Sequence, residues 1–203
     1  MIKKLLIIFI GIFLTETATS QSEFTVMTYN LLNFESTSSD RIPYFKTIMD
    51  EFQPDILVLE EVDSEAAFNM FKQDALNGFY AGGTYVANGT HYVQTICYKI
   101  TRFKFISNET ISTTVRDINQ FTLVHLATGD TLRVFGLHLK AGNSGADATQ
   151  RNTEIEELRK ITDQFSADQD FIVVGDFNFY SSDEPAYQLL KSSNSTINGN
   201  VVD

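Results

Sequence analysis

Hydrophobic positions change their spacing along the chain, and each spacing predicts an element. Residues 24–30, FTVMTYN, are rich in β-branched and aromatic side chains and predict a strand that ends at Asn30. Residues 40–52 carry apolar side chains three and four positions apart, which is typical of an amphipathic helix with Asp40 as its N-cap. Residues 55–62, DILVLEEV, predict a second strand that is buried on both faces.

Ser64 then precedes a second helical pattern over residues 65–76, so the chain begins in the order β, α, β, α. The middle of the chain shows strand patterns only, with turn residues between short apolar runs. These strands are predicted over residues 79–87, 92–99, 103–107, 121–128 and 131–139. Gly129 and Asp130 separate the last two runs and indicate a hairpin.

The last third of the chain returns to helix and strand. A polar loop over residues 140–149 leads into an amphipathic helix over 148–165, and residues 171–175 predict a final strand that runs into Asp176. Helices at both ends around an antiparallel middle favour an α+β fold in which two sheets pack together under outer helices. Because the chain shows no repeat or linker, we expect one domain over residues 21–203.

The first 20 residues are typical of a secretory signal peptide. Lys3 and Lys4 precede an apolar run over residues 5–14, and small residues follow it up to Ser20. The run is shorter than the roughly 20 residues of a membrane span, so we expect cleavage near Ser20 and secretion without a stable membrane anchor. The only cysteine, Cys97, lies in an apolar segment, which predicts a buried, inert thiol and no internal disulfide.

The charge of the chain is strongly negative. The formal net charge is -11, and loss of Lys3, Lys4 and Glu16 with the signal peptide removes a net +1, which gives -12. Such an acidic surface does not attract nucleic acid over its whole area. Binding of a polyanion would therefore need a local basic strip or bound metal ions.

Five polar residues stand where the predicted strands end. They are Asn30, Glu61, His138, Asp176 and Asn178. Strand ends are rigid and reach solvent, so they commonly present catalytic groups. A structural interpretation stays open for each, because Asp and Asn cap turns, an acidic strand end suits solvent, and a histidine can belong to a core. Arg151, which opens the third helix, fits either a brace for the site or a surface charge.

Four short motifs carry these five residues. They are TYN with Asn30, LVLEEV with Glu61, FGLHLKAG with His138, and VVGDFN with Asp176 and Asn178. In order and spacing, from residue 24 to residue 180, they resemble the motifs of the endonuclease/exonuclease/phosphatase superfamily. This resemblance implies a four-layer α/β/β/α sandwich.

The resemblance also implies roles for the five residues in phosphoester hydrolysis. Glu61 would be the main ligand of Mg²⁺, with Asn30 beside it, and such an oxygen site would also suit Mn²⁺ or Ca²⁺. Asp176 would orient and deprotonate the attacking water, while Asn178 would donate to the phosphoryl oxygens. His138 would contact the phosphate or protonate the leaving group.

The sequence departs from the superfamily at two places. The ligand motif has Glu60-Glu61 where Gln-Glu is usual, and strand alternation predicts that Glu60 points away from the site. The closing Asp-His pair does not occur in these 203 residues, so we expect the last strands of the second sheet to be missing and this fragment to be inactive. His91 and His125 adjoin no Ser-Asp pair, and we expect both to be structural.

Nucleic acid is the substrate that the resemblance favours, because the HLKAG type of motif is most similar to extracellular nucleases of the superfamily. One alternative is a sphingomyelinase-like enzyme that hydrolyses phospholipids. Another is an exported domain that binds a phosphate-containing ligand without turnover. The sequence distinguishes neither DNA from RNA nor one oligomeric state from another.

Overall fold

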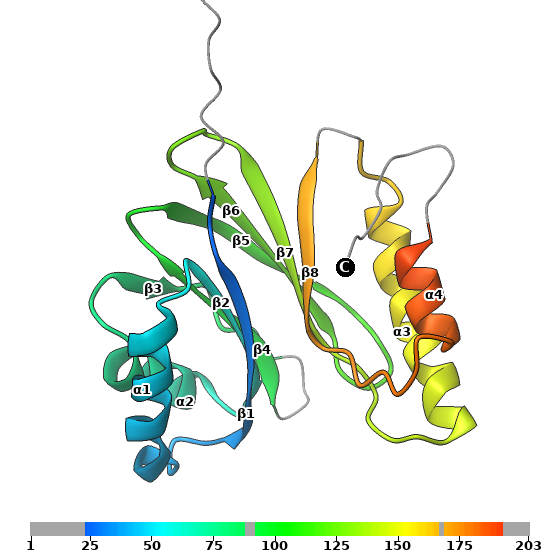
Figure 1. Cartoon of the computed structure of the whole chain (residues 1–203), viewed down its shortest axis with the longest axis horizontal. Coiled ribbons are helices and arrows are strands. Elements are labelled where there is room, and N and C mark those ends of the chain that lie inside the picture. Colours follow the sequence, from blue (N-terminus) through cyan, green and yellow to red (C-terminus); the bar gives the residue numbers. More distant parts are fainter. Residues whose placement is uncertain (1–22, 88–91, 167–168, 193–203) are drawn as a thin grey trace, which may run out of the picture.

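Two four-stranded sheets packed face to face form the centre of the molecule (Figure 1). The computed structural model describes residues 23–87, 92–166 and 169–192. Helices α1 and α2 cover the outer face of one sheet, and α3 and α4 cover the outer face of the other (Figure 1). This arrangement confirms the α+β sandwich with outer helices. The predicted signal peptide lies outside the described residues.

The first sheet has the strand order β1-β2-β4-β3. Its strands are β1 (Val26–Phe34), β2 (Ile56–Val62), β3 (Tyr80–Gly82) and β4 (Val93–Lys99). The elements that cover it are η1 (Ser39–Arg41), α1 (Ile42–Phe52), α2 (Glu65–Met70) and the π-helical turn η2 (Phe71–Ala75). Because β1 and β2 are parallel, their carboxyl ends lie side by side at one edge of the sandwich.

The second sheet has the order β5-β6-β7-β8. Its strands are β5 (Phe103–Ile111), β6 (Ile118–His125), β7 (Thr131–His138) and β8 (Asp170–Asp176), and its helices are α3 (Gly145–Thr162) and α4 (Pro185–Lys191). Strands β7 and β8 are parallel and end together, with His138 in register with Asp176. In the described part of the chain β8 is an edge strand, and six of its seven residues are only half-buried.

Several element boundaries differ from the sequence predictions. Asp40 is not an N-cap, because it lies inside the 3-10 turn and α1 begins at Ile42 with a proline in its first turn. Ser64 does cap α2, since its hydroxyl accepts the Ala67 N–H at 3.2 Å. The strand expected over 79–87 shortens to three residues. Helix α4, too short to show a periodic pattern, was not predicted.

Apolar side chains from both sheets, among them Val58 and Phe121, fill the space between the sheets. Gly136 of β7 lets the layers approach closely, because a Cβ there would lie 3.0 Å from Val58 Cγ1 of the other sheet and 3.1 Å from Phe121. Cys97 is fully buried, as predicted, and burial raises the pKa of its thiol to about 12. Within the described residues no helix has the length and apolarity to cross a membrane.

Candidate active site between the two sheets

The first sheet brings Asn30 and Glu61 together at the ends of β1 and β2. The register of β2 shifts between Leu59 and Val62, and Glu61 adopts a positive φ of 60° there. This irregularity turns the Glu61 side chain toward β1, where Oε1 accepts from Asn30 Nδ2 at 2.9 Å. The other oxygen, Oε2, accepts the backbone N–H of Asn33 at 2.8 Å. The carboxylate of Glu61 is thus fixed by two donors.

A left-handed turn after Asn30 directs the backbone N–H of Asn33 toward Glu61. Leu32 and Asn33 have φ values of 52° and 51°, a conformation that costs a non-glycine residue roughly 1–2 kcal/mol. Arg41 holds the turn in place by donating to the carbonyl oxygens of Leu31 and, at 2.8 Å, Leu32. Arg41 was not predicted from the sequence, because no motif marks an arginine whose partners are main-chain carbonyls.

The second sheet brings Asp176 and Asn178 to the end of β8. Gly175 has a φ of 138°, and a Cβ there would lie 1.9 Å from the carbonyl oxygen of Leu137, so only glycine fits before the aspartate. Asp176 Oδ1 accepts the N–H of Asn178 at 3.1 Å. The amide Nδ2 of Asn178 donates to the Leu139 carbonyl at 3.0 Å, which ties the β8 end to the β7 end.

The two pairs of strand ends meet across the gap between the sheets. Asn30 Nδ2 lies 3.3 Å from Asp176 Oδ2 while it also donates to Glu61. His138 stands between the two carboxylates, with Nδ1 3.9 Å from Glu61 Oε1 and Nε2 3.8 Å from Asp176 Oδ2. The structure therefore brings together all five polar residues that the sequence placed at strand ends.

His138 is buried, with 4% of its side chain exposed. Burial lowers the pKa of its imidazole, and the nearby Arg116 guanidinium lowers it further, against the opposing effects of Asp176 and Glu61. Nδ1 has no hydrogen-bond partner within the described part of the chain. A neutral, buried ring nitrogen without a partner is suited to a polar ligand that enters the site.

Glu60 does not point away from the site as strand alternation predicted. It is in register with Asn30, and its Oε1 accepts from the hydroxyl of Thr28, so it faces the space between the sheets behind the site. Only 1% of Glu60 is exposed. Burial raises the pKa of its carboxyl to about 8, and the charges of Asp176 and Glu61 also raise it. At neutral pH Glu60 is therefore an uncharged carboxylic acid.

The donor set at the site fits a hard cation held by few protein ligands. Glu61 and Asp176 offer carboxylate oxygens, and their side chains are 15% and 35% exposed, so water reaches both. The described residues contain no cluster of three or more His, Cys, Asp or Glu side chains that could enclose a metal. Mg²⁺ commonly binds with one or two carboxylates, several waters and a substrate phosphate, which this set allows. As placed, Asn30 directs its NH₂ group at both carboxylates, and a ligand role needs its amide to rotate.

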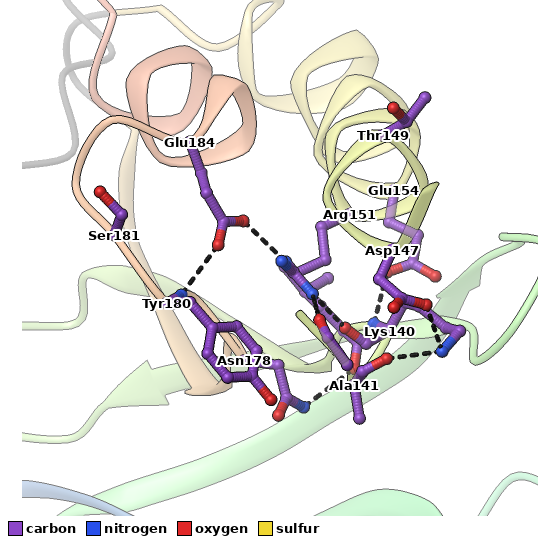
Figure 2. A network of polar contacts seen from close by, with 12 residues as sticks. Lys140, Ala141, Asp147, Thr149, Arg151, Glu154, Asn178, Tyr180, Ser181 and Glu184 are labelled. Carbon is purple, nitrogen blue, oxygen red and sulfur yellow. Dashed lines mark hydrogen bonds and ion pairs between the residues drawn. The ribbon is translucent and has the colours of Figure 1, made fainter. Parts of the chain in front are cut away.

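The structure favours one of the two interpretations of Arg151 and a structural role for His125. Arg151 is 1% exposed, so it is not a surface charge. Its guanidinium lies among the loops that follow β7 and β8 (Figure 2). His125 is 5% exposed and packs against the rings of Phe24 and Phe103, consistent with a structural role. His91 lies outside the described residues.

The fold and the site together define a class of protein. A profile described as the Endonuclease/Exonuclease/phosphatase family matches residues 27–201. The chain therefore belongs to this family, whose members hydrolyse phosphoesters as phosphodiesterases, phosphatases or nucleases and generally use divalent metal ions. The sequence finds no match among curated proteins.

Several solved structures share the fold. D. rerio TDP2 carrying 14 humanizing mutations has a TM-score of 0.62 and 18% identity over 78% of this chain and 64% of that chain. The human Nocturnin catalytic domain with a bound sulfate anion has a TM-score of 0.61 and 22% identity over 84% and 69%. The mannosyl-6-phosphatase of Bacteroides thetaiotaomicron has a TM-score of 0.63 and 18% identity over 82% and 69%.

These identities, all below 25%, establish the fold alone. The present chain spans just under two thirds of the length of the TDP2 structure.

Proposed function

We propose that this chain is the catalytic unit of a metal-dependent phosphodiester hydrolase that acts on nucleic acid. The observation that carries the proposal is the meeting of Asn30 and Glu61 from one sheet with His138 and Asp176 from the other. This group offers cation ligands, a base for water and a polar contact for phosphate. The shared fold of D. rerio TDP2 complexed with a single strand DNA product, at 18% identity and a TM-score of 0.60, supports the substrate class.

Each side chain has a defined task in this proposal. Glu61 would hold the metal ion, with Asn30 beside it through Oδ1. A bound Mg²⁺ or Mn²⁺ would offset negative charge that develops on the phosphate. Asp176 has one oxygen fixed by the Asn178 N–H and the other near the partly open centre of the site, so it can orient a water and accept its proton.

His138 and Asn178 would contact the phosphate. The lowered pKa of His138 favours the neutral ring, which exchanges hydrogen bonds with phosphoryl oxygens without carrying a full charge. The Nδ2 group of Asn178 uses one N–H on the Leu139 carbonyl and has a second N–H to donate. These contacts would hold the reacting phosphorus close to the water on Asp176.

A phosphorylated sugar is the second candidate substrate, and the specific observation in its favour is the charge. A net charge of -11 disfavours a long polyanion more than it disfavours a small phosphoester. The fold shared with a mannosyl-6-phosphatase, at 18% identity, is compatible with this candidate.

Export is a separate proposal that rests on the N-terminal sequence. Lys3, Lys4 and the apolar run up to Leu14 support cleavage near Ser20 and release outside the cytoplasm.

Metal affinity, measured by calorimetry with Mn²⁺, tests the proposed site directly. Glu61→Gln should weaken binding roughly 10-fold or more, because a neutral amide replaces the main anionic ligand. Glu60→Gln is the matched control one residue away, and it should leave the affinity unchanged because the native Glu60 is already uncharged at pH 7. The reverse order of effects would contradict the assignment of Glu61.

Substrate class is decided by assays of single-stranded DNA, RNA, a sugar phosphate and sphingomyelin vesicles with Mg²⁺ present. Cleavage of DNA or RNA that Asp176→Ala abolishes would support the first proposal. Turnover of the sugar phosphate or of sphingomyelin alone would refute it in favour of that substrate. Metal and phosphate binding with no cleavage of any substrate, both by this chain and by a version extended through an Asp-His closing motif, would instead favour an exported phosphate-binding domain.

A further inference from the structure

Arg151 is a fully buried cation that no step of the proposed reaction uses. It is 1% exposed and is among the largest fully buried side chains of the described residues. A buried charge is costly unless it is paired and hydrogen-bonded, so its partners indicate what it does. The partners come from the segments after β7 and β8, and Figure 2 shows Lys140 and Glu184 among them beside Arg151 of α3.

The first set of partners lies in the segment that follows His138. Arg151 Nη1 donates to the carbonyl oxygens of Lys140 at 2.9 Å and Gly142 at 2.7 Å. Glu154, one turn further along α3, accepts the N–H of Lys140 at 2.9 Å. Helix α3 therefore holds the peptide groups just beyond His138 through both a donor and an acceptor.

The second set of partners lies in the segment that follows Asn178. Arg151 Nε donates to Glu184 Oε2 at 2.8 Å, and Glu184 Oε1 accepts the N–H of Tyr180 at 2.8 Å. The guanidinium carbon also lies 5.4 Å from the centre of the Tyr180 ring. The Arg151 guanidinium, with a contribution from burial in the opposite direction, holds the pKa of Glu184 below its usual range, so the pair is ionic at neutral pH.

We propose that Arg151 and Glu184 form a positioning clamp for the catalytic half of the site. The clamp joins the segment after His138 to the segment after Asp176 and Asn178. The Asn178 Nδ2 bond to the Leu139 carbonyl crosses the same gap. Backbone pairing of β7 with β8 places His138 beside Asp176, and the Arg151–Glu184 pair holds the two segments that continue beyond this ladder, on whose positions contact of His138 and Asn178 with a phosphate depends. This inference rests on the proposed function of these residues.

Arg159 provides a matched control on the same helix. It is 6% exposed and also donates to main-chain carbonyls, at 2.8 Å to Leu189 and 2.6 Å to Ser192, and to the Asp163 carboxylate. The two carbonyls lie at the carboxyl end of α4 and Asp163 lies at the carboxyl end of α3, away from the site. Loss of either arginine should lower stability, but only loss of Arg151 should disturb the site.

The test compares Arg151→Gln, Arg151→Lys and Arg159→Gln as the whole chain. The readouts are thermal stability, affinity for inorganic phosphate with Mg²⁺ present, and two-dimensional NMR spectra of the His138 ring and the Asn178 amide. Arg151→Gln should weaken phosphate binding roughly 10- to 100-fold, the usual effect of removing a group that orients ligands. Arg151→Lys keeps the charge but cannot reach all three acceptors, so it should restore only part of the affinity.

Mn²⁺ affinity separates this inference from the proposed function. Arg151→Gln should lower Mn²⁺ affinity less than it lowers phosphate affinity, because the proposed metal ligand Glu61 belongs to the other sheet. Arg159→Gln should lower the melting temperature yet leave phosphate affinity and the His138 and Asn178 signals as in the native chain. Equal loss of phosphate affinity in Arg151→Gln and Arg159→Gln, or unchanged signals in Arg151→Gln, would overturn the clamp.

Failure of the native chain to bind Mn²⁺ or phosphate would overturn the proposed function instead. The NMR comparison would then still test whether Arg151 and Glu184 position His138 and Asn178. Glu184→Gln gives an independent variant if Arg151→Gln does not fold, because glutamine can still accept the Tyr180 N–H while the ionic bond is lost. Its signals at Asn178 should shift, and native signals there would contradict the inference.

Discussion

Replacing Glu60 by glutamine should change how the stability of the protein depends on pH. The carboxyl is 1% exposed, and burial, with the charges of Asp176 and Glu61, raises its pKa from 4.5 to about 8. Between these two values the folded chain keeps a proton on Glu60 that the unfolded chain has released. The unfolded chain then binds fewer protons, so stability falls as pH rises from about 4.5 to about 8.

The magnitude follows from the size of the shift. Each pKa unit corresponds to about 1.4 kcal/mol, so this group should remove on the order of 3 kcal/mol of stability by pH 7. Glutamine has the same shape, can still accept from the Thr28 hydroxyl and never ionises. Glu60→Gln should therefore match the native chain near pH 4.5 and exceed it increasingly up to pH 8.

Urea unfolding followed by circular dichroism between pH 4.5 and 8.5 measures this difference, since the chain has no tryptophan for fluorescence. Glu51→Gln, on the exposed surface of α1, corrects for the change of one unit in net charge. Parallel stability curves for the native chain and Glu60→Gln would refute the argument, because they would mean that Glu60 ionises equally in the folded and unfolded chains.

Three further outcomes are expected. Gly175→Ala should lose roughly 2–3 kcal/mol or more of stability in urea unfolding, because its Cβ would strike the Leu137 carbonyl. Gly129→Ala, also at positive φ but in open space, should lose about 1 kcal/mol, and equal losses would contradict the steric reason. This 203-residue chain should hydrolyse a phosphodiester roughly 10² to 10⁴ times more slowly than a version extended through an Asp-His closing motif, because a positioned acid-base partner is worth that factor; comparable rates would show that the site works without it. Mass spectrometry of exported protein should find an N-terminus near Gln21, and an intact Met1 would refute cleavage.

The order of elements and the five strand-end residues could be predicted from the sequence, because periodicity and short motifs are local properties of the chain. The position of Glu60 could not, since the positive φ at Glu61 breaks the alternation on which the prediction relied. Arg41 and Arg151 act on main-chain carbonyls 9 to 11 residues earlier in the chain, which the intervening turns fold back against them. Such partners depend on the conformation of these turns, and no spacing of side chains in the sequence reports it.

Because the site draws its groups from both sheets, the layer between the sheets acts as a spacer between the two sets of site residues. Gly136 has no side chain to keep the layers apart, since a Cβ there would lie 3.0 Å from Val58 Cγ1 of the other sheet. A methyl group gained at this position would push the two half-sites apart without touching any of the five site residues. Variation in this interior, far from solvent, would thus change the geometry of the site while every motif stays unchanged.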